Sequence, residues 1–210
     1  MAETILNSPD PVTLVCTGSL TNAATLLSVF PETKTKIEKI VSMGGAMGMG
    51  NTSPVAEWNI EIDPEAAKAV YGAGIPFYQV PLNVTHTALV TPEIIERIAE
   101  MKTPFADLVV DLMMFFAETY KDVFEFDCPP LHDPLAVAYV ICPELFKTKL
   151  MNVEIETNSS FCDGCTVCDY YGTTGRPKNA TVCLQVDVPQ FWELMISSLA
   201  KANENSPLNK

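Results

Sequence analysis

The fold of this chain is decided by residues 43–67, which read MGGAMGMGNTSPVAEWNIEIDPEAA. The stretch follows an apolar run, Ile40-Val41-Ser42-Met43, that is typical of a β-strand, and its glycines allow the backbone to turn tightly. Near its end, Asp63-Pro64-Glu65 supplies the N-cap, N1 and first-turn residues of a helix. The stretch therefore predicts a strand, a glycine loop and a helix in succession.

Polar side chains follow the glycines within the same stretch. Asn51, Glu57 and Asn59 are set among apolar neighbours, including Trp58. Binding sites of open α/β sheets lie outside the carboxyl ends of strands, which is where this loop is expected. Amide and carboxylate oxygens suit hydroxyl groups, whereas Glu57 would repel an anion, so we expect a polyol or sugar rather than a phosphate. A solvated loop followed by a capping Asp63 is the alternative.

The rest of the sequence alternates strand-like and helical segments, which predicts an open, mostly parallel sheet flanked by helices. Strands are expected at 12–16, 36–43, 76–80, 150–157, 165–170 and 181–186. A short helix is expected before residue 10, and a second follows the turn at 17–22 and ends at residue 29. Further helices are expected at 63–71, 91–100, 104–126, 131–142 and 189–201. We expect the first strand to be buried and residues 203–210 to be disordered. Neither a linker nor a repeat divides residues 1–210, so we expect a single domain.

The composition is that of a globular protein. The chain has 210 residues, of which 48% are hydrophobic and 19% charged. A formal charge of −13 argues against binding to nucleic-acid phosphates and to anionic membranes. Apolar runs stay short of the roughly 20 residues that cross a bilayer. Seven cysteines and an N-terminus unlike a signal peptide predict reduced thiols and a cytoplasmic location.

Two further segments contain side chains suited to catalysis or metal binding. In Leu131-His132-Asp133-Pro134, the imidazole can exchange a proton near neutral pH, and the carboxylate is a hard ligand for Ca²⁺ or Mg²⁺. Asp133 could equally cap a helix that begins at Pro134. Thr17 lies in the turn after the first strand, where an ordinary connection is the simpler interpretation.

Aromatic residues and His86 have simpler structural interpretations. Phe116 and Tyr120 lie one helical turn apart, which by periodicity alone makes them core residues. Residues 82–86 are expected at the end of the strand that begins at 76, so that His86 ends the strand and could face the site, but a structural role is favoured.

A cysteine cluster also has two interpretations. Cys162, Cys165 and Cys168 have a spacing that suggests zinc. A structural zinc site needs four ligands, so His132 or Cys183 would have to complete it, and alternate packing on a strand is the favoured interpretation.

Residues 43–67 resemble the ribose-binding segment of the inosine-uridine-preferring nucleoside hydrolases. That family carries a Met-Gly-Gly, then an Asn, then Ala-Glu-(Phe/Trp)-Asn before Asp-Pro-Glu-Ala-Ala. This sequence has Met43-Gly44-Gly45, Asn51, Ala56-Glu57-Trp58-Asn59 and the same final pentapeptide at matching spacing. The turn at Thr17 resembles the family's Thr-Gly-Pro-Leu-Thr-Asn, with Ser19 in place of Pro. The resemblance extends over residues 12–199 and implies a Rossmann-like α/β core.

The resemblance implies hydrolysis of the N-glycosidic bond of purine or pyrimidine ribonucleosides, and it implies a homo-oligomer. His132 would help the base to depart, while Asp133 and the main-chain carbonyl of Thr17 would bind calcium. The residues implied to bind the nucleoside are Met43, Asn51, Glu57, Trp58, Asn59 and Tyr120.

The family's N-terminal Asp-x-Asp-x-Gly-x-Asp-Asp cluster has no counterpart in this sequence. In the family it supplies the general base and most of the calcium carboxylates, and Ca²⁺ takes roughly 6–8 oxygens. We therefore expect this chain, which corresponds to the C-terminal two-thirds of the family domain, to bind calcium weakly or not at all and to hydrolyse nucleosides poorly. The expected truncation would also expose a sheet edge. The alternative is a non-catalytic remnant that binds ribosyl compounds or a partner subunit.

Overall fold

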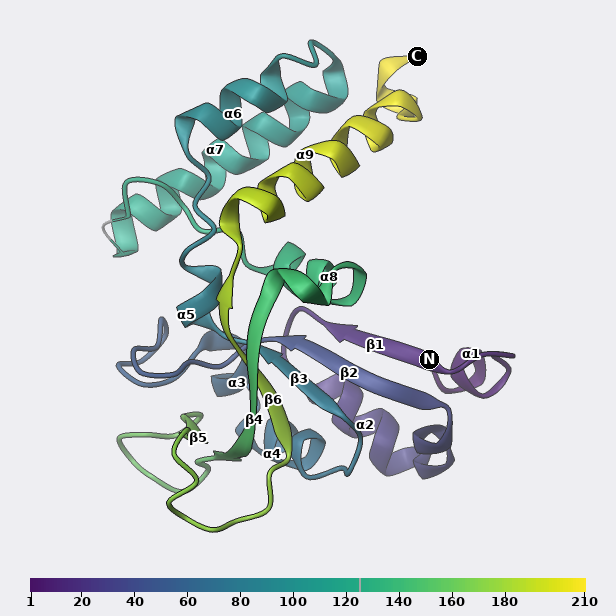
Figure 1. Cartoon of the computed structure of the whole chain (residues 1–210), viewed down its shortest axis with the longest axis vertical. Coiled ribbons are helices and arrows are strands. Elements are labelled where there is room, and N and C mark those ends of the chain that lie inside the picture. Colours follow the sequence, from purple (N-terminus) through teal and green to yellow (C-terminus); the bar gives the residue numbers. More distant parts are fainter. Residues whose placement is uncertain (125) are drawn as a thin grey trace. The chain divides into compact units, whose positions relative to one another are not determined.

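The computed structural model describes residues 1–124 and 126–210, which form two compact units. Unit 1 consists of Met1–Thr85 and His132–Val186, and unit 2 consists of His86–Leu131 and Asp187–Lys210. Figure 1 labels the helices and strands of the chain. The single-domain organisation expected for residues 1–210 stays a prediction.

Unit 1 is built on a six-stranded sheet with the order β1-β2-β3-β6-β4-β5. The strands are β1 (Val12–Cys16), β2 (Ile37–Met43), β3 (Phe77–Val80), β4 (Phe146–Ile155), β5 (Thr166–Asp169) and β6 (Ala180–Val186). β1, β2, β3 and β6 are parallel, whereas β4 pairs antiparallel with both β6 and β5. This arrangement confirms the open, mostly parallel sheet that the sequence predicts.

Helices cover the sheet of unit 1 on both faces. They are α1 (Ala2–Leu6), α2 (Thr21–Val29), α3 (Trp58–Glu61), α4 (Pro64–Tyr71), α5 (Leu82–Thr85) and α8 (Asp133–Ile141), with the 3₁₀ helices η1 (Pro31–Thr35) and η2 (Pro143–Leu145). α2 packs against α4, and α8 packs against β2 and β1. In Figure 1, α2 and α4 lie on the opposite side of the sheet from α8.

The N-terminus of α4 forms as its sequence predicts. The Asp63 carboxylate accepts a hydrogen bond from the Ala66 amide at 3.1 Å, and Pro64 occupies the first turn. The buried face of α4 then packs into the core of unit 1, where Val70 and Ile40 are fully buried and Phe77 is nearly so. Burial of each large apolar side chain contributes about 1.5–3 kcal/mol.

The expected burial of the first strand is wrong. β1 is half-buried, and Val15 is 40% exposed. The reason is its place at the edge of the sheet, where among the described strands it pairs with β2 alone. Its apolar composition predicts a parallel strand correctly but does not reveal whether a neighbour lies on both sides.

Residues 82–86 also differ from expectation. The chain forms the helical turn α5 directly after β3, with the Thr85 amide donating to the carbonyl of Pro81 at 3.1 Å. His86 follows this turn and belongs to unit 2, so it does not end a strand. Its ring lies 5.2 Å from that of Phe126, and burial lowers the pKa of its imidazole. These contacts suit the structural role favoured for His86.

Unit 2 is helical. It contains α6 (Pro92–Ala99), α7 (Pro104–Phe124), α9 (Val188–Glu204) and η3 (Pro207–Asn209). The helix predicted at 104–126 agrees over its first 21 residues, and Glu125 lies outside the described residues. No helix within residues 1–124 or 126–210 combines the length and apolar character needed to span a membrane.

The expected disorder at 203–210 is wrong. Asn209 donates to the carbonyl of Asn203 at 2.7 Å and accepts from the Phe105 amide at 3.1 Å. The Thr103 hydroxyl donates to the side chain of Asn203 at 2.5 Å. The bonds from Phe105 and Thr103 attach the end of the chain to the start of α7. They join residues about a hundred positions apart, which a local sequence pattern does not reveal.

Candidate functional site

The glycine loop leaves the sheet at Met43, the last residue of β2. Gly45 has φ +75°, and a side chain there would collide with the amide of Gln79 and lie 2.8 Å from the methyl group of Thr166. The carbonyl of Gly45 accepts from the Leu82 amide at 2.9 Å. Only glycine fits this position, which holds the loop close to β3, β5 and α5.

Glu57 links this loop to α3. Its side chain is 2% exposed, and its two oxygens accept from the amides of Gly45 at 2.8 Å and Asn59 at 2.9 Å. The second bond makes Glu57 the N-cap of α3. Burial raises the pKa of Glu57 to about 7, the backbone hydrogen bonds oppose this rise, and the charge of Asp133 adds to it. Glu57 is thus a buried carboxyl group that titrates near neutral pH.

Asn59 ties α3 back to the end of β2. Its side-chain amide donates to the main-chain oxygen of Met43 at 3.1 Å and approaches the Met43 sulfur at 3.3 Å. Because Cys16 pairs with Ser42 in the parallel ladder, Thr17 and Met43 leave the sheet at the same edge. The strand ends therefore bring Thr17 to the side of the sheet that bears Asn59.

Asn51 and Trp58 lie beside one another on the outer part of the loop. The side-chain oxygen of Asn51 accepts a hydrogen bond from the main-chain amide of Trp58 at 3.0 Å. The main-chain amide of Asn51 donates to the carbonyl of Ala56 at 3.1 Å. Trp58 is 53% exposed, in contrast to its buried neighbours Glu57 and Asn59. The loop thus presents a solvent-facing aromatic ring next to buried polar groups.

Asp133 begins α8 and does not cap it. The N-cap is His132, which makes no side-chain capping bond, so the capping alternative for Asp133 is wrong. Asp133 is solvent-accessible, yet partial burial raises the pKa of its carboxyl, and its charge in turn raises the pKa of Glu57. Asp133 therefore lies near the glycine loop, at the carboxyl edge of the sheet.

His132 forms a hydrogen bond with a partner that the sequence did not suggest. Its Nδ1 atom lies 2.7 Å from the hydroxyl of Thr85, a fully buried residue of α5. Tyr120 lies apart from these residues in the sequence and belongs to α7 of unit 2. It is 6% exposed, and its ring lies 4.7 Å from that of Phe116, as the helical periodicity predicts for core residues.

Sequence reasoning missed two residues of this region, Thr85 and Gln79. Both amide atoms of Gln79 are buried without a hydrogen-bond partner among the described residues, next to Gly45. Leaving a buried polar group unpaired costs about 1–3 kcal/mol. The only sequence signal was position: both residues lie in or just after an apolar strand, where polar side chains are unusual.

Calcium ligands are incomplete in the described part of the chain. Asp133 offers a carboxylate and Thr17 a main-chain carbonyl, whereas Ca²⁺ takes roughly 6–8 oxygens. The described residues contain no group of three or more His, Cys, Asp or Glu side chains able to hold a metal ion. Asp133 and Thr17 by themselves supply fewer oxygens than a calcium ion takes, so calcium binding and its expected weakness stay predictions. The same search finds no metal-binding group at Cys162, Cys165 and Cys168 among the described residues.

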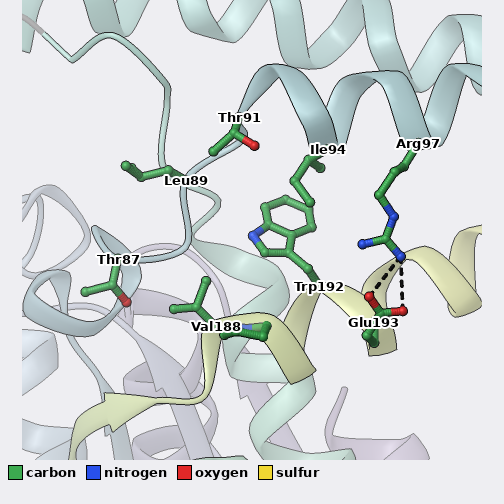
Figure 2. A pocket seen from close by; sticks show the side chains of 9 residues that line it. Thr87, Leu89, Thr91, Ile94, Arg97, Val188, Trp192 and Glu193 are labelled. Atoms are coloured by element: carbon green, nitrogen blue, oxygen red, sulfur yellow. Dashed lines mark hydrogen bonds and ion pairs between the residues drawn. The ribbon is translucent and has the colours of Figure 1, made fainter.

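A separate pocket of about 380 Å³ lies within unit 2 (Figure 2). Its lining residues are Thr87, Leu89, Thr91, Ile94, Arg97, Val188, Pro189, Trp192 and Glu193. In Figure 2 the Trp192 ring lies beside Ile94, and Arg97 forms an ion pair with Glu193 at 2.9 Å. None of the site residues predicted from the sequence lines this pocket.

The sequence matches known hydrolases over most of its length. The family model "Inosine-uridine preferring nucleoside hydrolase" matches residues 1–193. The chain is 47% identical over 194 residues to a probable ribonucleoside hydrolase of Dictyostelium discoideum, covering 90% of this chain and 57% of that relative. It is 46% identical over 201 residues to a pyrimidine-specific ribonucleoside hydrolase of Citrobacter koseri, covering 95% of this chain and 64% of that relative.

Solved structures of nucleoside hydrolases have the same fold as this chain. A purine-preferring ribonucleoside hydrolase from Gardnerella vaginalis superposes with a TM-score of 0.88 at 29% identity, covering 98% of this chain and 65% of that protein. An inosine-uridine preferring nucleoside hydrolase from Bacillus anthracis superposes with a TM-score of 0.76 at 30% identity, covering 95% of this chain and 63% of that protein. The chain spans less than two thirds of each of these relatives. By sequence and by fold, the chain belongs to the inosine-uridine preferring nucleoside hydrolase family.

Proposed function

We propose that the protein hydrolyses the N-glycosidic bond of ribonucleosides to give ribose and a free base. The observation that carries the proposal is the arrangement of Glu57. This residue is buried and accepts hydrogen bonds from the Gly45 and Asn59 amides, and the charge of Asp133 raises its pKa. Relatives include pyrimidine-specific and purine-preferring enzymes, so the proposal covers both classes of base.

The proposed substrate contacts follow from donor and acceptor chemistry. The amides of Asn51 and Asn59 and the carboxyl of Glu57 would bind the ribose hydroxyls, with Met43 lining the sugar site. The exposed ring of Trp58 offers an apolar surface to the sugar face. Tyr120 remains the residue proposed for the base side, on the resemblance alone.

The proposed reaction adds water across the bond between C1′ and the base nitrogen. The bond breaks with its electron pair going to the base, which receives a proton from His132. Water bonds to C1′ and loses its proton to the solvent, and the histidine regains one from the solvent. The negative charges near the sugar would stabilise the oxocarbenium-like transition state, as carboxylates do in glycoside hydrolysis.

We also propose that Asp133 and the Thr17 carbonyl are calcium ligands but that this chain alone binds Ca²⁺ weakly, because the described residues supply too few oxygens. No step above is assigned to the ion. A calcium-free protein that binds ribosyl compounds without hydrolysis is the second candidate, and the same shortage of ligands favours it. The homo-oligomer and the cytoplasmic location stay predictions.

One experiment separates the two candidates. The purified chain is incubated with uridine or inosine, with and without Ca²⁺, and free base is measured by chromatography. Calorimetric titration with ribose is run in parallel, with Asn59→Ala as the site variant and the exposed Asn7→Ala as the control. Base release supports hydrolysis, and ribose binding without base release supports the second candidate. Absence of both would contradict the proposed site.

A further inference from the structure

Helix α7 of unit 2 has two apolar faces, and one of them is packed against neighbouring helices. The packed face carries the buried side chains of Ala106 and Tyr120, and α7 lies beside α6 and η3 (Figure 1). Further large apolar side chains of α7 are exposed to solvent, namely Leu108, Leu112, Met114, Phe115, Phe116 and Val123. A surface helix of a globular protein usually turns polar residues to the solvent, so a second apolar face marks an interaction surface.

Most of the exposed side chains form one stripe along the helix. Leu112 and Phe115 lie four and seven residues after Leu108, a spacing that places them on one face because a helical turn takes 3.6 residues. Val123, fifteen residues after Leu108, extends the same stripe. The buried Tyr120 is rotated by about 120° from Leu108, so the stripe is separate from the packed face.

A row of carboxylates runs along one side of this stripe. It consists of four exposed residues, Asp107, Asp111, Glu118 and Asp122. Their spacing of i, i+4, i+11 and i+15 places them on one line, one residue before the positions of the stripe. None of them forms an ion pair in the described part of the chain. Like charges at i and i+4 destabilise a helix, and a cationic partner would relieve this repulsion.

The charge of the surface distinguishes between kinds of partner. A second copy of the chain carries the same formal charge of −13, and an antiparallel pair of α7 helices would bring two acidic rows together. An anionic membrane is repelled by the same carboxylates. A helix with its own apolar stripe and flanking Lys or Arg residues complements both the stripe and the row. The charge therefore favours a basic amphipathic helix.

We propose that the stripe and the acidic row of α7 form a docking surface for a basic amphipathic helix of another protein. The two helices lie side by side, with apolar side chains of the partner packed on Leu108, Leu112 and Phe115. Cationic side chains of the partner, spaced seven residues apart, pair with Asp111 and Glu118, which are also seven residues apart. The inference does not depend on the proposed hydrolysis and uses no residue of the proposed sugar site.

Fluorescence anisotropy with a labelled synthetic peptide tests this surface on the whole chain. The probe consists of three repeats of Lys-Leu-Ala-Ala-Leu-Lys-Ala, which as a helix has a leucine stripe flanked by lysines. The matched peptide has glutamate in place of every lysine. We expect the lysine peptide to bind at least about tenfold more tightly than the glutamate peptide at low salt. Equal binding of the two peptides, or no binding of the lysine peptide up to about 100 μM, overturns the inference.

Substitutions on α7 locate the binding. Leu112→Ser should weaken binding of the lysine peptide about tenfold, because it removes the centre of the stripe. Met114→Ser is the matched control, since Met114 is also exposed on α7 but is rotated by about 200° from Leu112. It should leave the affinity unchanged. Circular dichroism shows that each variant is folded, and equal losses in the two variants contradict the docking surface.

A charge exchange tests the acidic row separately. Asp111→Lys combined with Glu118→Lys should weaken binding of the lysine peptide and strengthen binding of the glutamate peptide, each by about fivefold. The control is Glu96→Lys combined with Glu100→Lys, which reverses two exposed charges at α6. The control should retain the preference for the lysine peptide. A preference that changes equally in both double variants means nonspecific attraction to an acidic protein and overturns the inference.

Other occupants of the surface are distinguished by two further measurements. Sedimentation of the chain alone detects a dimer, and flotation with phosphatidylcholine vesicles detects binding to lipid. We expect a monomer and no flotation. A dimer that Leu112→Ser dissociates, or vesicle binding that the same substitution abolishes, would assign the stripe to a second copy or to lipid and would overturn the proposed partner.

Discussion

Glu57 accepts a hydrogen bond from the Gly45 amide at 2.8 Å, which joins a buried carboxyl group to a loop that only glycine can form. The same carboxyl group caps α3 through Asn59. One side chain therefore determines the relative position of the two segments that provide the proposed sugar contacts. The effects of removing this charge and the bonds around it can be measured separately.

Glu57 should make stability depend on pH. Burial raises the pKa of Glu57 from 4.5 to about 7, so the folded protein binds this proton more tightly than the unfolded chain. The stabilisation is present below about pH 4.5 and is lost as pH rises to about 7, by up to about 3 kcal/mol. Urea unfolding from pH 4.5 to 7.5 should show a smaller decline for Glu57→Gln than for the unchanged protein.

The control for that series is Glu38→Gln on β2, where the glutamate is exposed. Its profile should follow that of the unchanged protein. A Glu57→Gln profile with the same slope as the unchanged protein would mean that Glu57 has an ordinary pKa in the folded state.

Thr166→Val should weaken the attachment of the glycine loop to β5. The Thr166 hydroxyl donates to the carbonyl of Ala46 at 2.6 Å and accepts from its amide at 2.9 Å, and the residue is 4% exposed. Valine has a similar shape but leaves both groups of Ala46 without this partner, which should cost about 2–3 kcal/mol in the free energy of unfolding. Thr181→Val on β6, whose hydroxyl has no hydrogen bond in the described structure, should change stability by less than about 0.5 kcal/mol. Equal effects of the two substitutions would contradict the loop attachment.

Gln79→Met should maintain or increase stability. Both polar atoms of the Gln79 amide are buried without a partner among the described residues, so an apolar side chain of similar shape removes a desolvation penalty of about 1 kcal/mol. Thermal and urea unfolding measure the change, with the exposed Gln190→Met as the control for the same replacement. A loss above about 1 kcal/mol would indicate that the Gln79 amide has a bound partner, such as an internal water molecule.

Calcium should have little effect on this chain. With Asp133 and Thr17 as the proposed ligands, we expect a dissociation constant no tighter than about 1 mM, similar to the weakest protein calcium sites. Unfolding temperatures measured with 0.1 mM Ca²⁺ and with a chelator should then coincide. A clear rise in the unfolding temperature that Asp133→Asn abolishes would show that the chain provides more oxygen ligands than we infer.

The elements near the proposed site were predictable because their signals are local. Asp63-Pro64 marks the start of α4, and the apolar run up to Met43 marks β2, since capping and strand formation depend on residues next to one another. Where the outcome depended on distant partners, prediction failed. The edge position of β1 and the ordering of the C-terminal residues by Asn209 are two such cases.

The sequence by itself determined the strand, glycine loop and helix of residues 43–67, the mostly parallel sheet and the family, because periodicity, caps and motifs are properties of neighbouring residues. Only the tertiary structure decided that Thr85 is hydrogen-bonded to His132, that Thr166 is hydrogen-bonded to Ala46, and that Glu57 is buried near Asp133. Each of these relationships joins segments far apart in the chain. Such pairings arise when strands align and helices pack, and burial then sets the strength of the bonds and the pKa of the carboxyl group.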